Sequence, residues 1–560
     1  MAELKSTGLL VLPSPSHRRS FPQPNLDNIS IANPPIFKLH DDLLWLIFWL
    51  NADMEGEAQG KDEIAAIDTL RYSSQVCSGW RQIILSFPSL WGQVVNLSHL
   101  EQDDWREEVL RRTGKSLLSV LWGSQRQACL SVDVAAGLLR RHWGRIRSLD
   151  FNFTSSYYTE GFNIAQFWEI FCRPSEVLEI FRVIFERVDR ECTPILSPSN
   201  FVVFNNVAPA LRVFYAPNIE FNLDAPWLEN LRYLALSGPV SAYKVVQAIQ
   251  HMPRLECLVD GTFNAIASTG DSLSSQPQIS APSIKEIVLV SHSDLGPYMD
   301  FLAQIKPAAG CYLTFRHTGV TFNAKALALA SRVVYNYSRC CDLPSAIDIC
   351  LDLYCHRFIF MAQIPRKGQF CFRLTYFIKL RREIFEALFE ALPSVKFPDV
   401  KTLMFGISPL FLKPSDRRIA QFILSVPSVE TLATNPETLG FLLNLPSDVL
   451  ALSFPVLHTV KFARSIQPEE LSNIKQFLTS RISTGRPVDI LSFPLPTIDR
   501  GFDTDLRSLD EFTGLTIILQ YGDHENKHIC GVSHINNLFI RRIQRRVSES
   551  PSSESSSEGE

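Results

Sequence analysis

Residues 253–258 read Pro-Arg-Leu-Glu-Cys-Leu, and the same kind of phrase recurs along the chain: a proline, an aliphatic residue two positions later, and another apolar residue three positions after that. Further copies begin at Pro209, Pro282, Pro398, Pro427 and Pro455, and residues 228–236 form a copy without proline. Counted from the first aliphatic residue, the copies are 20 residues apart (211 to 231), 24 (231 to 255), 29 (255 to 284), 29 (400 to 429) and 28 (429 to 457). Periods of this length are typical of repeat proteins.

Helical stripes of apolar residues separate the copies. Residues 245–249 carry such a stripe before the Pro253 copy, and residues 419–424 carry one before the Pro427 copy. Each unit is therefore expected to combine one strand with one helix. Because one such unit cannot bury its own apolar face, the units must stack. The pattern predicts an α/β fold in which strand-helix units form a curved solenoid with the strands on its concave side. The alternative is an ordinary α/β domain, since buried strands also contain leucines three residues apart.

Other segments depart from the repeat. The rhythm breaks between residues 310 and 398, although residues 371–377 have the composition of a strand and residues 381–392 that of a helix. Residues 433–448 are predicted as a loop. Residues 516–521 are predicted as a last strand that caps the array.

A second stretch is decisive for function. Leu43 to Leu50 are eight consecutive apolar residues directly after Asp41-Asp42, and either aspartate suits the N-cap of a helix. A helix that is apolar all round needs burial on more than one side. Eight residues rise about 12 Å, far less than the roughly 20 residues needed to cross a bilayer. The second covering surface is therefore expected to be protein.

The following residues extend this unit. Ile67, Leu70, Ser74, Cys77 and Ile84 fall at helical spacings, and Pro88 ends the pattern. Three short helices in about fifty residues form a small core, and cores of that size commonly need a neighbour for stability.

The N-terminal unit resembles an F-box, although His40 stands where that family usually has proline. The matching residues are Leu39, Leu43-Leu44, Ile47-Phe48, Leu50, Leu70, Val76-Cys77, Trp80-Arg81 and the ending Pro88-Ser89-Leu90-Trp91. The resemblance implies a partner, because F-box helices bind the small adaptor subunit of cullin-RING ubiquitin ligases. It also implies the contact residues, some of which must form the unit's own core: Leu39, Leu43, Leu44, Ile47, Phe48, Leu50, Val76, Cys77, Trp80, Leu90 and Trp91.

The repeats resemble the irregular leucine-rich repeats attached to many fungal F-box proteins, over about residues 148–493. In such repeats the residues between the buried aliphatic positions face the concave side and bind the partner. The resemblance places these residues there: Tyr233, Ala235, Glu286, Val288, Thr402, Met404, Thr459 and Lys461. Among them, Tyr233, Glu286, Met404 and Lys461 are the candidate substrate-binding residues. Their mixed chemistry favours a protein substrate.

Composition excludes several classes of protein. The chain is 46% hydrophobic and 20% charged, with a net charge of −4, which predicts a globular protein with no general attraction to nucleic acid or to anionic membranes. Its 12 cysteines are scattered, with no zinc-type spacing, and are expected to be reduced thiols. No secretory signal is recognised, so the expected location is cytoplasmic, nuclear or both.

The chain carries no recognisable catalytic motif. It lacks a phosphate-binding glycine loop and the H-E-x-x-H and G-x-S-x-G motifs. We therefore expect a protein that is not an enzyme, with no catalytic residue, no cofactor and no metal ligand set. The basic stretch from Leu138 to Arg147 is interpreted as the solvated face of a helix.

These observations divide the chain into five parts. Residues 1–35 are expected to be a disordered tail, 36–97 the F-box, 98–147 a helical linker with the first solenoid elements, and 148–540 the solenoid. Residues 541–560 form a Ser/Glu-rich tail in which Ser548 and Ser550 are possible phosphorylation sites.

The expected function is that of a substrate-recruiting adaptor of a cullin-RING (SCF-type) ubiquitin ligase. In this hypothesis the F-box binds the ligase adaptor subunit and the solenoid binds a protein substrate. The alternative is a leucine-rich-repeat scaffold that binds proteins without any ligase, in which the N-terminal helices cap the open end of the array.

Overall fold

A computed structural model provides the structure of the chain. It describes residues 39–540 except for 55–63, 124–130, 154–164, 186–197, 199–200, 218, 237–239, 261–265, 268–276, 293, 320–323, 378–381, 393–394, 410–411, 465, 495–503 and 522–523. The two predicted tails, including Ser548 and Ser550, lie outside the described residues.

One sheet of 18 strands runs through the described chain, and most of its neighbouring strands are parallel. Its strands are β1 (Val95–Asn96), β2 (Leu118–Trp122), β3 (Ile146–Phe153), β4 (Ile180–Phe185), β5 (Val213–Tyr215), β6 (Tyr233–Leu236), β8 (Cys257–Asp260), β11 (Glu286–Ser291), β13 (Tyr312–Gly319), β14 (Asp348–Tyr354), β15 (Arg357–Ile364), β16 (Gly368–Tyr376), β17 (Thr402–Ile407), β18 (Thr431–Thr434), β19 (Thr459–Phe462), β20 (Ile490–Pro494), β22 (Thr516–Tyr521) and β23 (His524–Ile529).

The helices are α1 (Asp41–Asn51), α2 (Ala66–Val76), α3 (Ser78–Ser86), α4 (Pro88–Gln93), α5 (Asp103–Arg112), α6 (Val132–His142), α7 (Ala165–Phe171), α8 (Ala242–Gln250), α9 (Leu295–Gln304), α10 (Ala324–Cys340), α11 (Arg382–Glu390), α12 (Arg417–Ser425), α13 (Pro436–Leu443), α14 (Ser447–Leu452) and α15 (Leu471–Ser483). Three small sheets pair β7 (Val240–Ser241) with β9 (Ile266–Ala267), β10 (Ile279–Ser280) with β12 (Ile305–Lys306), and β21 (Thr504–Asp505) with β24 (Phe539–Ile540). The predicted α/β class is confirmed.

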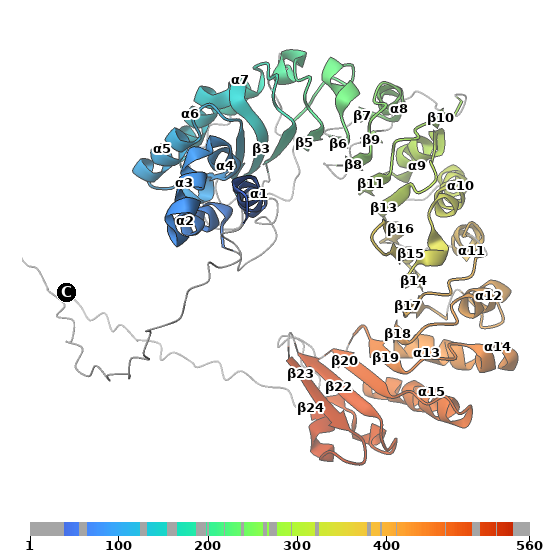
Figure 1. Cartoon of the computed structure of the whole chain (residues 1–560). Helices are drawn as coiled ribbons and strands as arrows, with labels where there is room; N and C mark the ends of the chain where they lie inside the picture. Colours follow the sequence, from blue (N-terminus) through green and yellow to red (C-terminus); the bar gives the residue numbers. More distant parts are fainter. Residues whose placement is uncertain are drawn as a thin grey trace, which may run out of the picture.

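The strands of the large sheet follow an arc, and helices α6 to α12 lie along its outer side (Figure 1). Strands β1 to β6, then β8, β11 and β13, pair in chain order with parallel neighbours. Strands β17 to β20 and β22 do the same at the other end. The described helices of the chain include none with both the length and the apolar character needed to cross a bilayer.

The segment that broke the sequence rhythm holds a local reversal of strand order. Strand β13 pairs with β16 and not with β14, because β14, β15 and β16 form an antiparallel meander inserted into the sheet. Strand β14 then pairs in parallel with β17 and restores the earlier direction. The repeat resumes there without a break in the hydrogen-bonded ladder.

The repeated phrase places its two apolar positions in the core. Its first aliphatic residues are buried throughout: Leu211, Leu231, Leu255, Ile284, Val400, Val429 and Leu457. Its second apolar residues pair across neighbouring strands, as in Leu403, Leu432 and Val460. Each copy therefore adds its two apolar side chains to a column of buried residues that continues from strand to strand. The buried residues from Leu44 to Leu538 form one hydrophobic cluster.

Charged residues link successive units at the start of the strands. Lys285 Nζ lies 2.7 Å from Glu256 Oε2, and Lys401 Nζ lies 2.5 Å from Glu430 Oε1. The hydrogen bond from each lysine lowers the pKa of its glutamate. Because these pairs are exposed to solvent, they add little to the free energy of unfolding, so the buried column carries the stability.

The predicted loop at residues 433–448 is wrong, because α13 occupies half of it and α14 begins within it at Ser447. The side chain of Asn435 accepts a hydrogen bond from the Thr438 amide at 2.8 Å, and Pro436 takes the first helical position. An asparagine cap followed by proline is a helix start signal. The apolar run after it is buried against the sheet.

Substituting Leu432→Ala tests the apolar column. Leu432 is fully buried between Leu403 and Val460, so the substitution should lower the free energy of unfolding by about 2–5 kcal/mol. Urea denaturation followed by tryptophan fluorescence measures the change. The control Leu452→Ala removes an exposed leucine of α14 and should shift stability by less than about 0.5 kcal/mol. Equal effects of the two substitutions would contradict the stacking account.

Candidate functional site

Helix α1 has two apolar faces, and only one of them is buried. Leu44 and Phe48 are 5% and 1% exposed. Leu43, Ile47 and Leu50 are 50%, 37% and 66% exposed, and they fall one helical turn apart along a different face of the helix. The helix therefore keeps an unburied apolar stripe within the chain, although its sequence has no polar face.

The inner face of α1 packs on aromatic side chains. The rings of Phe48 and Trp80 meet edge to face with centroids 5.1 Å apart. The rings of Trp45 and Phe87 have centroids 6.3 Å apart, and the Arg147 guanidinium lies 5.9 Å from the centre of the Trp49 ring. Such contacts fix the rotation of the helix about its axis, so the same three aliphatic side chains stay outward.

The start of α1 differs from the prediction. The N-cap is His40, whose Nδ1 accepts a hydrogen bond from the Asp42 amide at 3.4 Å. Asp41 and Asp42 instead occupy the first turn, where their charges complement the positive end of the helix dipole. The predicted aspartate N-cap is therefore wrong by one or two residues. Leu39 precedes the cap and is half-buried.

Helices α2 and α3 meet at Cys77. Its backbone is extended, and its Sγ accepts a hydrogen bond from the Trp80 amide at 3.4 Å, which caps α3. Farther along, the indole of Trp91 donates to the Ile84 carbonyl at 2.9 Å. Leu90 and Trp91 are fully buried, so the Pro88 to Trp91 ending closes the core of the unit.

The structure sorts the predicted adaptor contacts by exposure. Leu43, Ile47, Leu50 and Val76 are exposed, Leu39, Cys77 and Trp80 are half-buried, and Leu44, Phe48, Leu90 and Trp91 are buried. The four buried side chains form the core of the N-terminal unit, so they hold the exposed residues in position and do not themselves contact a partner.

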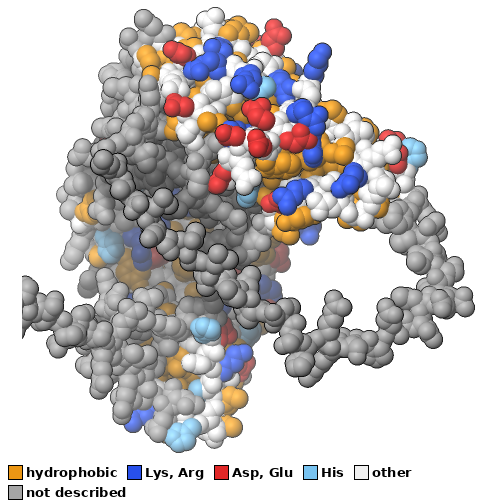
Figure 2. Space-filling view, turned by 90° about the vertical axis from the view of Figure 1, so that its left-hand side faces the viewer, with side chains coloured by type: hydrophobic (Ala, Val, Ile, Leu, Met, Phe, Trp, Pro, Cys, Tyr) orange, Lys and Arg blue, Asp and Glu red, His pale blue; other side chains and the backbone are white. Residues whose placement is uncertain are grey.

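Five exposed apolar residues extend the surface beyond the predicted set: Leu46, Ile64, Tyr72, Leu85 and Phe87. Tyr72 lies one turn before Val76 on α2, and helical spacing from Val76 was the signal that identifies it. Figure 2 looks onto this end of the molecule, where hydrophobic side chains gather beside acidic and basic ones. Large exposed apolar patches mark interaction sites.

The predicted substrate-binding residues lie on the strand face opposite the buried column. Tyr233 and Glu286 both pair with Cys257 across adjacent strands, and Met404 and Lys461 both pair with Ala433. The register therefore separates them into two groups along the sheet. Glu286, Met404 and Lys461 are exposed, and burial raises the pKa of the half-buried Tyr233.

Between these groups, the same strand face carries three arginines. Arg316 and Arg373 are exposed register partners on β13 and β16, so two like charges lie side by side. Arg357 of β15 pairs with Asp352 at 2.7 Å. Burial raises the pKa of Asp352 to about 6 although Arg357 opposes the shift. Adjacent like charges repel, so this arginine cluster favours an anionic ligand.

One histidine and serine come together, but not as a catalytic pair. His317 Nδ1 lies 3.2 Å from Ser291 Oγ, and burial lowers the pKa of His317 to about 4. Ser291 and His317 are 0% and 1% exposed, so a substrate has no access to the hydroxyl. The contact is part of the packing between β11 and β13.

Comparison with known proteins identifies no relative: no protein-family model matches the chain, and no curated protein matches it.

Paired substitutions separate the two faces of α1. Phe48→Ala should destabilise the N-terminal unit by about 3–5 kcal/mol, because the side chain is buried against Trp80. Ile47→Ala on the outer face should cost less than about 1 kcal/mol. Hydrogen exchange of the α1 to α3 amides measures both. If Ile47→Ala opened the unit as much as Phe48→Ala does, the outer stripe would belong to the core.

Proposed function

We propose that this chain is a substrate-recruiting adaptor of a cullin-RING (SCF-type) ubiquitin ligase. The exposed stripe of Leu43, Ile47 and Leu50, on a helix whose Leu44 and Phe48 are buried, carries the proposal. In it, residues 36–97 act as an F-box that binds the ligase adaptor subunit. The strand-helix units that follow act as a leucine-rich-repeat-like solenoid that binds a protein substrate.

A protein partner fits this stripe better than a lipid surface. Helix α1 has 11 residues and carries Asp41 and Asp42 in its first turn, where anionic headgroups would repel them. Membrane-surface helices usually carry basic residues on their polar face. Burying one large aliphatic side chain contributes roughly 1.5–3 kcal/mol, so the three side chains supply enough energy for a specific protein interface.

The anchoring of α1 favours a preformed docking surface. Trp45, Phe48 and Trp49 fix the helix through contacts with Phe87, Trp80 and Arg147. The outer side chains are thus held in place before the partner arrives, which lowers the entropy lost on binding. A rigid attachment also holds a bound substrate at a constant distance from the ligase.

In this proposal no covalent step occurs on the chain. Its contribution is proximity, because tethering turns the encounter between substrate and charged conjugating enzyme into a local event. Such a protein would work in the cytoplasm, the nucleus or both.

The substrate side is proposed to be the strand face that carries Tyr233, Glu286, Met404 and Lys461. The arginine cluster of Arg316, Arg357 and Arg373 lies between these residues in the strand order. Arg357 pairs with the carboxylate of Asp352, whereas Arg316 and Arg373 form no ion pair with the described residues. An acidic segment of a protein substrate supplies the missing negative charge.

Replacing two stripe residues tests the ligase contact. The double variant Ile47→Asp with Leu50→Asp should weaken binding of the purified ligase adaptor by about 100-fold or more, because at least about 3 kcal/mol of apolar burial is lost. Calorimetric titration of the full chain measures the affinity. The matched control Leu452→Asp with Ile482→Asp places the same charges at exposed apolar positions of α14 and α15 and should bind normally.

The same variants decide between the adaptor and the scaffold without ligase attachment. Circular dichroism must first show that each variant is folded. If the folded wild-type chain does not bind the ligase adaptor, or if the stripe variant binds as tightly as the control, the F-box assignment is wrong. The N-terminal helices would then act as a cap of the array.

Removing charge from the arginine cluster tests the substrate face. Arg316→Gln with Arg373→Gln should reduce co-purification of substrate proteins at least tenfold, since each charged hydrogen bond contributes about 1.5–3 kcal/mol. Quantitative mass spectrometry of affinity-purified material measures the change. The control Arg332→Gln with Arg339→Gln removes two exposed charges from α10. Unchanged partners in the strand variant would exclude recognition by the cluster.

A further inference from the structure

The last strand of the large sheet is held by very few side chains. Strand β23 pairs with β22 in antiparallel register and forms the edge of the sheet. Of its six residues, His528 alone is buried, and the others are exposed. An edge strand of this kind depends on its backbone ladder and on whatever His528 contacts.

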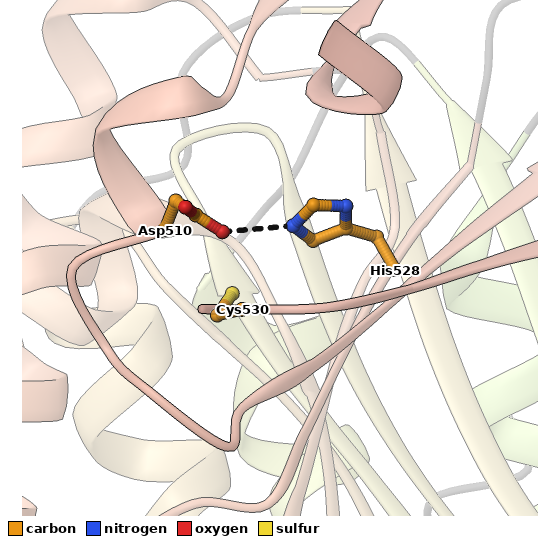
Figure 3. Close-up of side chains that lie close together, drawn as sticks. All are labelled: Asp510, His528 and Cys530. Carbon is orange, nitrogen blue, oxygen red and sulfur yellow. Dashed lines mark hydrogen bonds and ion pairs between the residues drawn. The ribbon is translucent and has the colours of Figure 1, made fainter. Parts of the chain in front are cut away.

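Two further ligand-type side chains meet His528 at this edge. Asp510 follows the short 3₁₀ helix Arg507–Leu509, and its Oδ1 lies 2.9 Å from His528 Nε2. Cys530 is fully buried, and its sulfur points toward the gap between the carboxylate and the imidazole (Figure 3). One ligand atom from each of the three residues lies within 4.8 Å of the others.

We propose that Asp510, His528 and Cys530 bind a divalent transition metal of the Zn²⁺ class. A thiolate, an imidazole and a carboxylate are ligands that Zn²⁺ accepts, whereas Mg²⁺ and Ca²⁺ prefer oxygen alone. Bond lengths of about 2.0–2.3 Å at tetrahedral angles place ligand atoms about 3.3–3.7 Å apart. The three atoms need shifts of no more than about 1 Å to reach such an arrangement.

Every proton is accounted for when the metal binds. Burial raises the pKa of Cys530 to about 11, and the neighbouring Asp510 charge adds to the effect, so the free thiol is neutral. Metal binding forms the metal–sulfur bond, and the thiol proton leaves to solvent. His528 moves its hydrogen from Nε2 to Nδ1 and presents the Nε2 lone pair. Nδ1 is already buried without a hydrogen-bond partner, so moving the hydrogen to it does not increase the number of buried polar atoms without a partner.

The carboxylate of Asp510 can bind the metal and still keep one of its present hydrogen bonds. Its Oδ1 accepts from the Gly531 amide at 3.0 Å and from His528. Once Nε2 of His528 presents its lone pair, Oδ1 no longer accepts a hydrogen bond from it and can bind the metal while the Gly531 bond is kept. The Asp510 side chain is 22% exposed, so the ion can reach the carboxylate from solvent. Water would serve as the fourth ligand of a tetrahedral ion.

Such a metal would join segments 18 residues apart in sequence. It would connect the turn after residue 509 to the edge strand and so hold the C-terminal end of the sheet closed. The inferred role is a structural clamp, which is independent of whether the N-terminal helices bind a ligase. The site also explains why the one buried side chain of β23 is a histidine.

Cobalt binding by the full chain tests the site, because Co²⁺ reports its ligands spectroscopically. After chelator treatment under reducing conditions, the wild-type chain should bind one equivalent of Co²⁺, with a thiolate-to-metal band in the near ultraviolet. Zn²⁺ should displace it. Cys530→Ser should lose the thiolate band and bind at least 100-fold more weakly, whereas the control Cys355→Ser should match the wild type. A folded wild-type chain without this band would overturn the proposal, whatever the variants do.

Two variants exclude a purely structural hydrogen bond. Asp510→Asn keeps an oxygen that accepts from His528, so it should retain the fold and lose at least tenfold in metal affinity. Hydrogen exchange of the wild-type β23 amides should slow on addition of Zn²⁺. If Zn²⁺ leaves these amides unchanged, or if Asp510→Asn binds metal as the wild type does, the clamp is wrong.

Discussion

This structure depends on one constraint: a single strand-helix unit cannot bury its apolar side chains, so each unit must pack beside the next. Each repeated phrase supplies two buried apolar residues and a short strand, and neither is stable without the next unit. The register of Leu403, Leu432 and Val460 shows the result, an apolar column that is continuous across strands. The antiparallel insertion of β14 to β16 is accommodated because it keeps that ladder unbroken.

A stacked array leaves two ends that need covering, and the chain treats them differently. At the first end, helix α4 contacts β2, and the buried residues of the N-terminal unit continue into the core of the sheet. That unit uses its inner face for this purpose and keeps the stripe of Leu43, Ile47 and Leu50 free. At the other end, β23 has one buried side chain, His528, and the proposed metal would strengthen that contact.

Local signals predicted much of the fold. The strand at Thr516–Tyr521 and helix α11 were predicted from the local sequence, because the residues that define each element are near one another in the chain. The loop prediction for residues 433–448 is wrong because Asn435 followed by Pro436 is a helix start signal, and α13 begins there. The order of β13, β16, β15 and β14 could not be predicted, since Thr314 pairs with Cys371, 57 residues later, and such pairing leaves no local pattern in the sequence.

For the candidate sites too, the local sequence identified the residues but not their long-range contacts. The sequence identified the apolar residues of α1 but not which face the core would take, because all eight positions are apolar. Burial of Leu44 and Phe48 resolves this. Hydrogen-exchange mass spectrometry of the full chain with and without the purified ligase adaptor tests the central claim most directly. The account predicts protection concentrated on the outer face of α1 and on α2. Protection absent there, with the adaptor in excess over the chain, would contradict it.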